Sequence, residues 1–449
     1  ALLNSLRACP AGNWFILCTE HFPMRSPLSG QCLPHGTLTS ASSMLRRILL
    51  VGSYCQTASA LLNSLSSRQD SSERKAMLAW LRRYSFNDFV RHFERPYEPD
   101  TEEWNLREAI FNRRMEEVLD FHAGPPQSWT MGITKFMDFS DPEFNAMMGY
   151  RGRRKHATAA LLSTDRKQEN LPSEVNTLVP GSRLALLIRD QGGCGSCWAE
   201  AATAVLEARI ESNKTLMGML KTKTKSMSRK SLVPTLSTQT VVSCSPNPRH
   251  CGGSGGCGGA TAELAYKLIK ERGLPLAMSW PYRSFDGSTP ACKDSVFEQA
   301  LIGIGGWTVL PSNQLNPLKR ALYDTGGPIA VTAAASGWAY YERGIYSDVS
   351  DKKPSGDFVV NHAVVLTGYK DPEPDEMGYW VVKNSWGESW GEHGYIRIEM
   401  KENEHQHCGW DYSPQEGIAC DGDPAKAWVC GTCGILYDST FPTGIFLRE

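Results

Sequence analysis

The spacing of apolar residues predicts two helical segments before residue 125. Within residues 73–122, Pro96 and Pro99 interrupt an apolar face formed by Trp80, Leu81, Phe86, Phe89 and Val90. A second helix is predicted from about Thr101 to Phe121, because its apolar residues recur near the 3.6-residue period of an α-helix. These are Trp104, Ile110, Phe111, Met115, Val118 and Leu119. A polar, basic run at 151–170 follows, and we expect it to be an exposed connector open to proteolysis.

From Leu171 onward the pattern predicts helices first and strands later. One helix follows Cys197, and another runs from about Ala260 to Glu271 and ends at Gly273, a normal helix stop. Beyond residue 325, short β-rich runs bounded by turn residues predict strands. They begin at Phe358, Ala363, Tyr379 and Tyr395. This order favours an α+β domain with two lobes.

The first 60 residues show a different pattern. Residues 1–43 have no clear periodicity, and a basic start at Met44, an apolar stretch from Ile48 and Ala58-Ser-Ala60 are typical of a secretory signal peptide. With that interpretation, residues 1–43 are upstream translated sequence without a structural role. The alternative is a disordered N-terminal tail.

Composition narrows the choice of partners and compartment. The 449 residues are 41% hydrophobic and 21% charged, with a formal net charge of −1. We therefore expect neither a nucleic-acid nor an anionic membrane partner, and no apolar run approaches the ~18–20 residues of a membrane span. Ten of the fourteen cysteines lie between Cys194 and Cys433. Such clustering indicates disulfides in an oxidising compartment, a metal site, or one reactive thiol among structural ones.

Three motifs in order carry candidate chemistry. In Asp190-Gln-Gly-Gly-Cys-Gly-Ser-Cys-Trp-Ala199, a thiol at Cys197 opens a helix, where the helix dipole favours thiolate. His362 lies beside a predicted strand, and Asn384-Ser-Trp386-Gly follows. Taken singly, Cys197 could be half of a disulfide, His362 a core histidine, and Asn384-Ser-Trp386 a turn at a strand end. The occurrence of all three motifs in this order decides between these alternatives.

The motif Cys-Gly-Ser-Cys-Trp at Cys194–Trp198 and the two that follow resemble the papain family of cysteine proteases. The resemblance implies a helical lobe and a β-barrel lobe, preceded by a helical inhibitory prosegment. It implies Cys197 and His362 as a thiolate–imidazolium pair, Asn384 as the residue that orients the imidazole, and Trp386 as its cover. Gln191 and the Cys197 backbone N–H would stabilise the oxyanion. No cofactor and no metal are expected.

Two features depart from the family. His362 lies 362 − 197 = 165 residues beyond Cys197, against ~130–150 in the family. Lys214–Lys230, with six basic residues and no acid, is one insertion that explains the spacing. We expect a solvated surface loop there, with a processing site or a polyanion-binding patch as alternatives. The second departure is Glu200, which would raise the thiol pKa if it lies near Cys197, or else pairs with a cation.

A prosegment is predicted from partial motif matches. The family's propeptide helix motif is met at Glu103, Arg107, Phe111 and, with Val for Ile, Val118, whereas Arg114 and His122 replace its two Asn. Its second motif resembles Gly132-x-Thr134-x-Phe136-x-Asp138, with Thr for Asn. The expected domains are 1–60 (upstream segment and signal peptide), 61–168 (inhibitory propeptide) and 169–449 (peptidase). An unrelated helical domain is the alternative for the second.

By resemblance, Cys194 pairs with Cys257 and Cys244 with Cys292, while the family's third bridge lacks one partner. Five cysteines remain, at 251, 408, 420, 430 and 433. Cys430-Gly-Thr-Cys433 could be half of a zinc site, but we favour disulfides with one cysteine left over. Asn213-Lys-Thr215 is a glycosylation sequon.

The resemblance also places a substrate pocket for the second residue before the scissile bond. Its members are Gly259, Ala260, Thr261, Ala262, Val360, Ala363 and, at the floor, Asp438. Small and apolar walls suit Leu, Val or Phe, and an acidic floor adds acceptance of Arg or Lys. The alternative is that Asp438 points to solvent as a turn residue.

The expected function is a cysteine endopeptidase made as a zymogen that acts on proteins or peptides. We expect a monomer inhibited by its own prosegment, in the secretory pathway and then a lysosome- or vacuole-like compartment or outside the cell. Acid should promote maturation, because carboxylates such as Asp138 lose charge. Alternatives are an exopeptidase and a catalytically silent homologue that binds other proteins.

Overall fold

The computed structural model describes residues 74–149, 171–178, 181–225, 235–347, 358–417 and 419–449. The chain divides into two units, Ala1–Ser71 and Ser72–Glu449, and all that follows concerns the second. The predicted signal peptide and the basic connector at 151–170 lie outside the described residues.

The N-terminal part of the described chain is helical, as its periodicity predicts. After a helix at 74–81 come α2 (Phe86–His92), α3 (Glu102–Ala123) and the short α4 (Asp141–Ala146). Side-chain oxygens of Ser85, Thr101 and Ser140 cap the first turns of these three helices. The apolar stripe of α3 is buried at Trp104, Phe111, Met115 and Val118. Trp80 differs from the prediction, because it is 47% exposed.

A group of helices forms the first lobe of the second half. Its members are α5 (Arg183–Leu186), α6 (Cys197–Ser212), α7 (Lys214–Lys225), α8 (Thr238–Cys244) and α9 (Ala262–Arg272). Helix α6 is buried along most of its length. Its many alanines are small, which allows neighbouring elements to pack closely against it. Helix α9 ends at Gly273, whose φ of 77° few other residues adopt. In the sequon, the Asn213 side chain accepts a hydrogen bond from the Leu216 N–H.

The second lobe is built on a mixed sheet, which among the described residues has ten strands when β1 of the N-terminal segment is included. Nine follow the order β1-β6-β9-β8-β7-β5-β12-β4-β3, and β2 pairs with β7. The strands are β1 (Trp129–Met131), β2 (Glu174–Asn176), β3 (Leu274–Pro275), β4 (Ala300–Val309), β5 (Ile329–Ala333), β6 (Tyr341–Tyr346), β7 (His362–Lys370), β8 (Gly378–Lys383), β9 (Tyr395–Met400) and β12 (Ser439–Leu447). A separate hairpin joins β10 (Cys408–Asp411) to β11 (Ala427–Cys430), and α10 (Leu315–Thr325) lies before β5.

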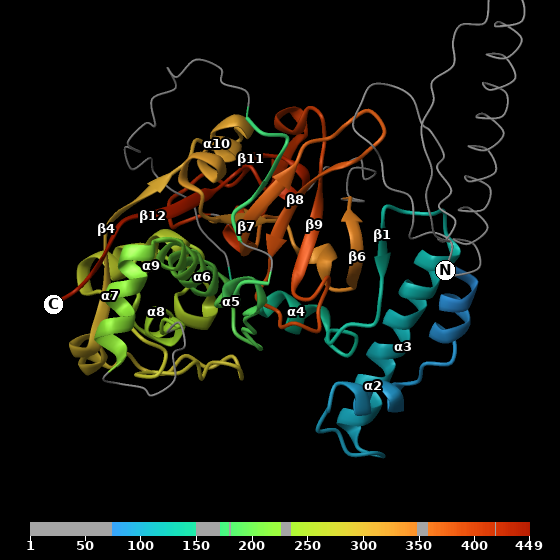
Figure 1. The fold of residues 1–449 in the computed structure, drawn as a ribbon. Helices are drawn as coiled ribbons and strands as arrows, with labels where there is room; N and C mark the ends of the chain where they lie inside the picture. The colour runs from blue at the N-terminus through green and yellow to red at the C-terminus, as the bar shows by residue number, and fades with distance from the viewer. Residues whose placement is uncertain (1–73, 150–170, 179–180, 226–234, 348–357, 418) are drawn as a thin grey trace, which may run out of the picture. The chain divides into compact units, whose positions relative to one another are not determined.

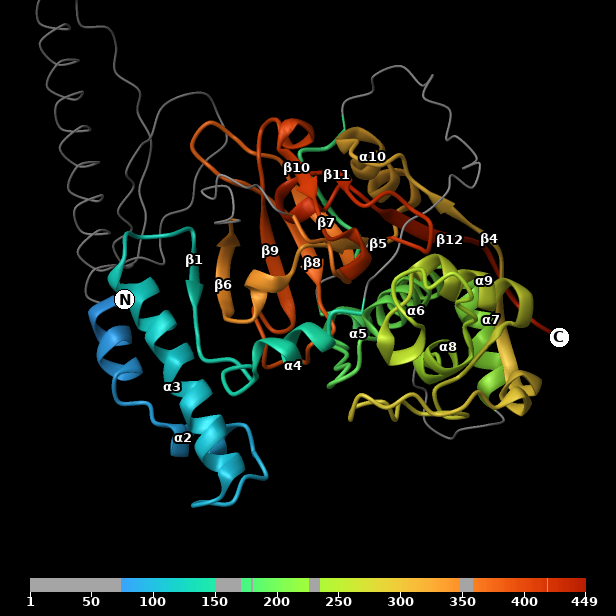
Figure 2. The same cartoon turned by 180° about the vertical axis from the view of Figure 1, so that it is seen from behind.

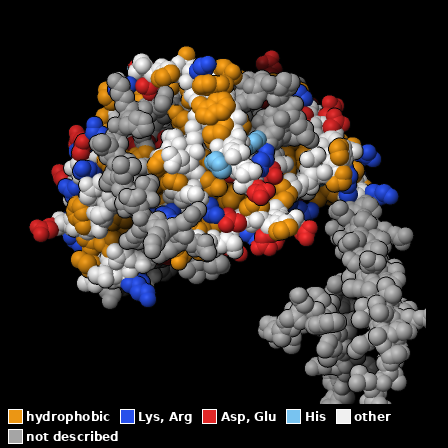
Figure 3. Space-filling view, turned by 90° about the horizontal axis from the view of Figure 1, so that it is seen from above, with side chains coloured by type: hydrophobic (Ala, Val, Ile, Leu, Met, Phe, Trp, Pro, Cys, Tyr) orange, Lys and Arg blue, Asp and Glu red, His pale blue; other side chains and the backbone are white. Residues whose placement is uncertain are grey.

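Figures 1 and 2 show how these parts meet. Helices α6, α8 and α9 gather on one side and the strands β5, β7, β8 and β9 on the other, with α6 packed against β7. Strand β1 lies beside β6, and helix α3 lies beside β1 on the side away from β6. On the face in Figure 3, acidic and basic side chains alternate in small groups along the rim. Among the described residues, no helix is both long and apolar enough to cross a bilayer.

The predicted α+β class with a preceding helical segment is confirmed, but three local predictions are wrong. Residues 358–361 are not a strand, and β7 begins at His362. Strand β4 lies before residue 325, where no strand was expected. The described part of the basic insertion is helix α7, not a loop, because Leu216, Met217 and Leu220 bury one side of it while its lysines stay outside.

Candidate active site

Cys197 is the first residue of α6 and is held there by the loop that precedes it. The disulfide Cys194–Cys257 ties this loop to its neighbour, and the Gly195 N–H donates to the Cys257 carbonyl at 3.1 Å. A side chain at Gly195 would collide with that carbonyl, since a Cβ there would lie 2.5 Å from the oxygen. The thiol therefore sits at the positive end of a 16-residue helix.

His362, Asn384 and Trp386 form a second group on the strands. The His362 Nε2 and the Asn384 Oδ1 are 2.8 Å apart, and the Ser385 N–H also donates to this oxygen at 2.8 Å. The Trp386 ring stacks on the imidazole with centroids 4.8 Å apart. The His362 Nδ1 is buried and has no hydrogen-bond partner among the described residues. Asn384 thus fixes one imidazole nitrogen and leaves the other for a reacting group.

Helix α6 and strand β7 bring the two groups together. The backbone N–H of Ala363, the residue after His362, donates to the Cys197 Sγ at 3.4 Å. Cys197 and His362 are both completely buried. The nucleophile and base candidates therefore lie at the contact between the two lobes.

The N-terminal segment occupies this site. The Gln191 Nε2 donates to the carbonyl of Met147 at 2.8 Å, and the Ala260 N–H donates to the carbonyl of Gly149 at 3.1 Å. The Gly149 N–H hydrogen-bonds to the Cys197 thiol. A Cβ at Gly149 would lie 1.6 Å from the Gly195 carbonyl oxygen, so only glycine fits there. The segment thus lies directly over the thiol and fills the Gln191 donor position.

A strand pairing and an aromatic cluster hold that segment in place. Strand β1 adds antiparallel to the edge strand β6, and the Thr134 Oγ1 donates to the Ala339 carbonyl at 2.6 Å. Phe136 and Phe144 pack edge-on against Trp386, with centroids 5.2 and 5.5 Å away. Lys135 pairs with Asp190, next to Gln191, at 2.7 Å. Trp386, which covers the imidazole, therefore also binds the N-terminal segment.

Burial holds both reacting groups neutral in this covered state. It raises the pKa of the Cys197 thiol to about 11. It also lowers the pKa of His362 to about 4, although the hydrogen bond with Asn384 acts the other way. The thiolate–imidazolium pair that the sequence predicts is therefore disfavoured while the segment is bound.

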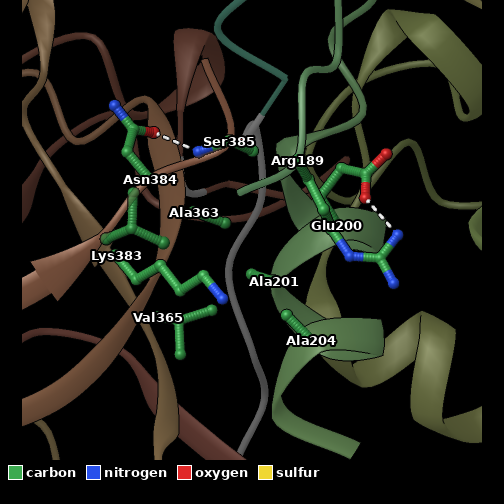
Figure 4. Close-up of a pocket in the computed structure, with 10 residues that line it drawn as sticks. Arg189, Glu200, Ala201, Ala204, Ala363, Val365, Lys383, Asn384 and Ser385 are labelled. Carbon is green, nitrogen blue, oxygen red and sulfur yellow. Dashed lines mark hydrogen bonds and ion pairs between the residues drawn. The ribbon is translucent and has the colours of Figure 1, made fainter. Parts of the chain in front are cut away.

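Glu200 belongs to a buried charged cluster behind the site (Figure 4). Its Oε2 accepts from the Arg189 Nη1 at 3.0 Å, while the Arg189 Nη2 donates to Glu207 at 2.7 Å. Lys383, directly before Asn384, lines the same small cavity, and burial lowers the pKa of Lys383 to about 8. Of the two alternatives for Glu200, pairing with a cation is the one found.

The predicted pocket residues lie on both sides of the covered thiol. Gly259 and Ala260 face Gly149, and Ala262 opens α9 just after Thr261. Val360 and Ala363 flank His362 on the other lobe and are buried. Asp438 is partly exposed, and its carbonyl accepts from the Thr332 N–H at 3.1 Å.

Sequence reasoning missed Thr332 as a candidate pocket residue. It pairs with Ala363 across β5 and β7, so the two side chains share one face of the sheet. Its Oγ1 is buried without a hydrogen-bond partner among the described residues. No local motif marks Thr332; only the strand register reveals it.

The described residues contain four disulfides. Two are Cys194–Cys257 and Cys244–Cys292, the pairings that the resemblance implies. The others are Cys251–Cys420 and Cys408–Cys430. Cys430 is therefore not available as half of a zinc site, and Cys433 is a buried thiol outside these four bridges.

Comparisons with known proteins bear on both parts of the chain. Residues 171–418 match the family described as "Papain family cysteine protease", and residues 86–144 match the "Cathepsin propeptide inhibitor domain (I29)". Procathepsin L of Rattus norvegicus is 32% identical over 325 residues, which cover 70% of this chain and 86% of the relative. A KDEL-tailed cysteine endopeptidase of Arabidopsis thaliana is 30% identical over 319 residues, covering 68% and 78%.

Solved precursor structures share the fold. The recombinant stem bromelain precursor has a TM-score of 0.57 at 25% identity, covering 80% of this chain and 97% of that one. Digestive procathepsin L 3 of Tenebrio molitor has a TM-score of 0.55 at 23% identity, with the same coverage.

Proposed function

This chain belongs to the papain family of cysteine proteases, and we propose that Cys197, His362, Asn384 and Gln191 are its catalytic residues. It is an endopeptidase made as a zymogen with an inhibitory propeptide. In the proposed roles, Cys197 is the nucleophile, His362 the acid and base, and Asn384 the residue that orients His362. Trp386 shields the hydrogen bond between His362 and Asn384 from water.

The reaction follows from these positions. The Cys197 thiolate attacks the carbonyl carbon of a peptide bond, and the developing oxyanion accepts hydrogen bonds from the Gln191 Nε2 and the Cys197 N–H. As the C–N bond breaks, the His362 imidazolium gives its proton to the leaving amine, and a thioester remains. His362 then takes a proton from water, which attacks the thioester, releases the acid and restores the thiolate–imidazolium pair.

One observation supports this assignment above the others: the prosegment lies in the site as a peptide. The Met147 carbonyl accepts from Gln191, the group proposed to bind the oxyanion, and Gly149 lies between Cys197 and Ala260. A substrate would use the same donors. The prosegment inhibits because it occupies them, with His362 and Cys197 both buried and neutral.

For specificity, we propose a pocket whose walls are Thr261, Ala262, Val360, Ala363 and the newly identified Thr332. The walls suit Leu, Val or Phe in the second residue before the scissile bond. Asp438 is proposed at the floor, where it would accept Arg or Lys; its backbone contact with Thr332 supports this position. Substrates are proteins and peptides.

We further propose that maturation cuts the connector and leaves a peptidase that begins near residue 169. Four disulfides and relatives such as procathepsin L and a KDEL-tailed endopeptidase support the secretory pathway. Within that pathway we propose a lysosome- or vacuole-like compartment or the extracellular space as the site of action, and a monomer as the active form.

The test is Cys197→Ala, processed in trans so that it does not depend on its own activity. Peptide hydrolysis should fall to background while the thermal unfolding midpoint stays near that of wild type. Cys433→Ala, which removes the other buried thiol, is the matched control and should retain activity. Near wild-type turnover by a pure Cys197→Ala enzyme would refute the assignment.

A further inference from the structure

The loop of the β10–β11 hairpin reaches from the sheet lobe to the helical lobe. We call residues 412–417 and 419–423 the strap. The disulfide Cys251–Cys420 joins it to the loop after α8. Three hydrogen bonds reinforce this link: the Asp421 N–H donates to the Arg249 carbonyl (2.9 Å), Arg249 Nη2 donates to the Asp421 carbonyl (3.0 Å), and the His250 ring lies 2.7 Å from the Asp421 carboxylate. The strap is thus fixed covalently and by polar contacts.

At its other end the strap lies against Val360, two residues before His362. A Cβ at Gly417 would lie 1.6 Å from the Val360 carbonyl oxygen, so the two backbones are in contact. The Val360 N–H donates to the Asp411 carboxylate at 3.2 Å, and the Phe358 N–H donates to the Trp410 carbonyl at 3.3 Å. The hairpin therefore supplies the hydrogen bonds that residues 358–360 lack from a strand partner.

On the helical lobe the link begins beside the residue that binds the prosegment. A Cβ at Gly252, next to Cys251, would lie 2.4 Å from the Ala260 carbonyl carbon. A Cβ at Gly259 would lie 2.1 Å from the Gly252 oxygen and 2.9 Å from the Gly149 oxygen. The backbones of Gly149, Gly259 and Gly252 are therefore packed in a row. The strap thus connects the two cleft walls immediately beyond the point where Ala260 holds Gly149.

We propose that the strap determines specificity at the third residue before the scissile bond, where it admits only compact side chains. This rests on the proposed function, because a substrate must lie where the prosegment lies. A cross-link between the two walls prevents them from moving apart, and close-packed backbones leave little space for a large side chain. Val360 is a proposed wall of the neighbouring pocket, and Ala260 binds Gly149, so the strap begins where the next substrate residue would pass.

The test uses the mature enzyme and two peptides that differ only at that position, Ala in one and Trp in the other. In the double variant Cys251→Ser/Cys420→Ser, the Trp-to-Ala ratio of kcat/KM should rise about tenfold or more, the scale of one pocket contact. Turnover of the Ala peptide should change little. Cys244→Ser/Cys292→Ser removes a disulfide that does not contact the strap, and its ratio should equal that of wild type.

A second variant keeps the disulfide, in case its loss prevents folding. Asp421→Ala removes the carboxylate contact with His250, and the ratio should rise in the same direction by a smaller factor. An unchanged ratio in whichever of the two strap variants folds overturns the proposal. Labelling of Cys197 by an epoxide thiol inhibitor separates the two hypotheses. If Cys197 is not labelled, the proposed function fails. If Cys197 is fully labelled and the Trp-to-Ala ratio is unchanged, only the strap proposal fails.

Discussion

Glu200 shows how one residue can differ from the family pattern without acting on the nucleophile. It lies one helical turn beyond Cys197, but its carboxylate bonds to Arg189 and to the Thr238 hydroxyl. Burial raises the pKa of Glu200, and Arg189 opposes that effect. The dominant influence on the pKa of Cys197 is its own burial. Sequence spacing placed Glu200 near the thiol along the helix, but only tertiary packing decides which group it faces.

Replacing Asp438 tests whether its side chain belongs to the proposed pocket. If its carboxylate lies at the pocket floor, Asp438→Ala should lower kcat/KM for peptides with Arg at the second position before the scissile bond by about tenfold or more, in line with ~1.5–3 kcal/mol for a hydrogen bond to a charged group. Peptides with Leu there should be spared, since an apolar side chain makes no such bond.

The measurement is the Arg-to-Leu ratio of kcat/KM in the mature enzyme. Asp421→Ala, which removes an acid from the strap instead, serves as the comparison and should leave this ratio unchanged. An Arg-to-Leu ratio equal to that of wild type in Asp438→Ala would remove Asp438 from the pocket.

At the scale of elements, the sequence predicted those with a local signal and missed those that depend on distant contacts. Helices α3, α6 and α9 have an internal period or a clear stop signal, and all three were predicted. Residues 358–360 read as a strand because they are apolar and two of them are valines, but the N–H groups of Phe358 and Val360 bond to β10. Helix α7 carries too many lysines to be read as amphipathic, although three apolar residues suffice to bury one side.

Helix α4, which lies just before the segment over Cys197, carries an acid-sensitive ion pair. Arg107 on α3 holds Glu143 on α4 by two bonds of 2.6 Å, and this hydrogen bonding lowers the pKa of Glu143 to about 2. A carboxylate with a lowered pKa stabilises the folded state above its ordinary pKa, near 4.3, and this stabilisation is lost as pH falls toward 2. Burial raises the pKa of Asp138 despite Arg95, so protonation of Asp138 favours the folded form. This pKa direction argues against the acid trigger that the sequence placed at Asp138 and makes Glu143 the group to test.

We therefore expect Glu143→Gln to release the prosegment at higher pH than wild type. The readout is the rate at which an epoxide inhibitor labels Cys197 in the precursor between pH 3 and 7. Glu103→Gln is the matched control, because Glu103 binds the same Arg107 but is about half exposed, and its effect should be smaller. Identical labelling profiles for Glu143→Gln and wild type would show that this ion pair does not hold the prosegment.

At the scale of the whole molecule, the sequence predicted the lobes, the prosegment and the order of the motifs, but not how distant segments meet. The Cys251–Cys420 bridge joins residues 169 apart in sequence, and no local pattern specifies that pairing. Thr332 enters the proposed pocket only through its register with Ala363. Likewise, a motif for a reactive thiol does not reveal that another part of the same chain keeps it neutral.

The neutral state of the covered site leads to the last prediction, about the charge on Cys197 before and after maturation. In the precursor, burial raises the pKa of the thiol to about 11 and lowers that of His362 to about 4, so at pH 5–8 both are uncharged. Removing residues 74–149 exposes both groups to water and relieves these shifts. The thiol at the helix N-terminus can then ionise against the imidazolium, with a pKa in the range of ~3.5–7.5 known for activated cysteines.

Iodoacetamide alkylation of Cys197, followed by peptide mass mapping over pH 4–10, measures this change. Mature enzyme should react at pH 6, whereas the intact precursor should react only at strongly alkaline pH. In mature His362→Ala the midpoint should rise toward ~8.5, the value of an ordinary cysteine, because the thiolate has lost its cationic partner. Alkylation of the buried Cys433, measured in the same maps, would reveal any general unfolding. If precursor and mature enzyme gave the same pH profile, burial by the prosegment would not be what keeps Cys197 uncharged.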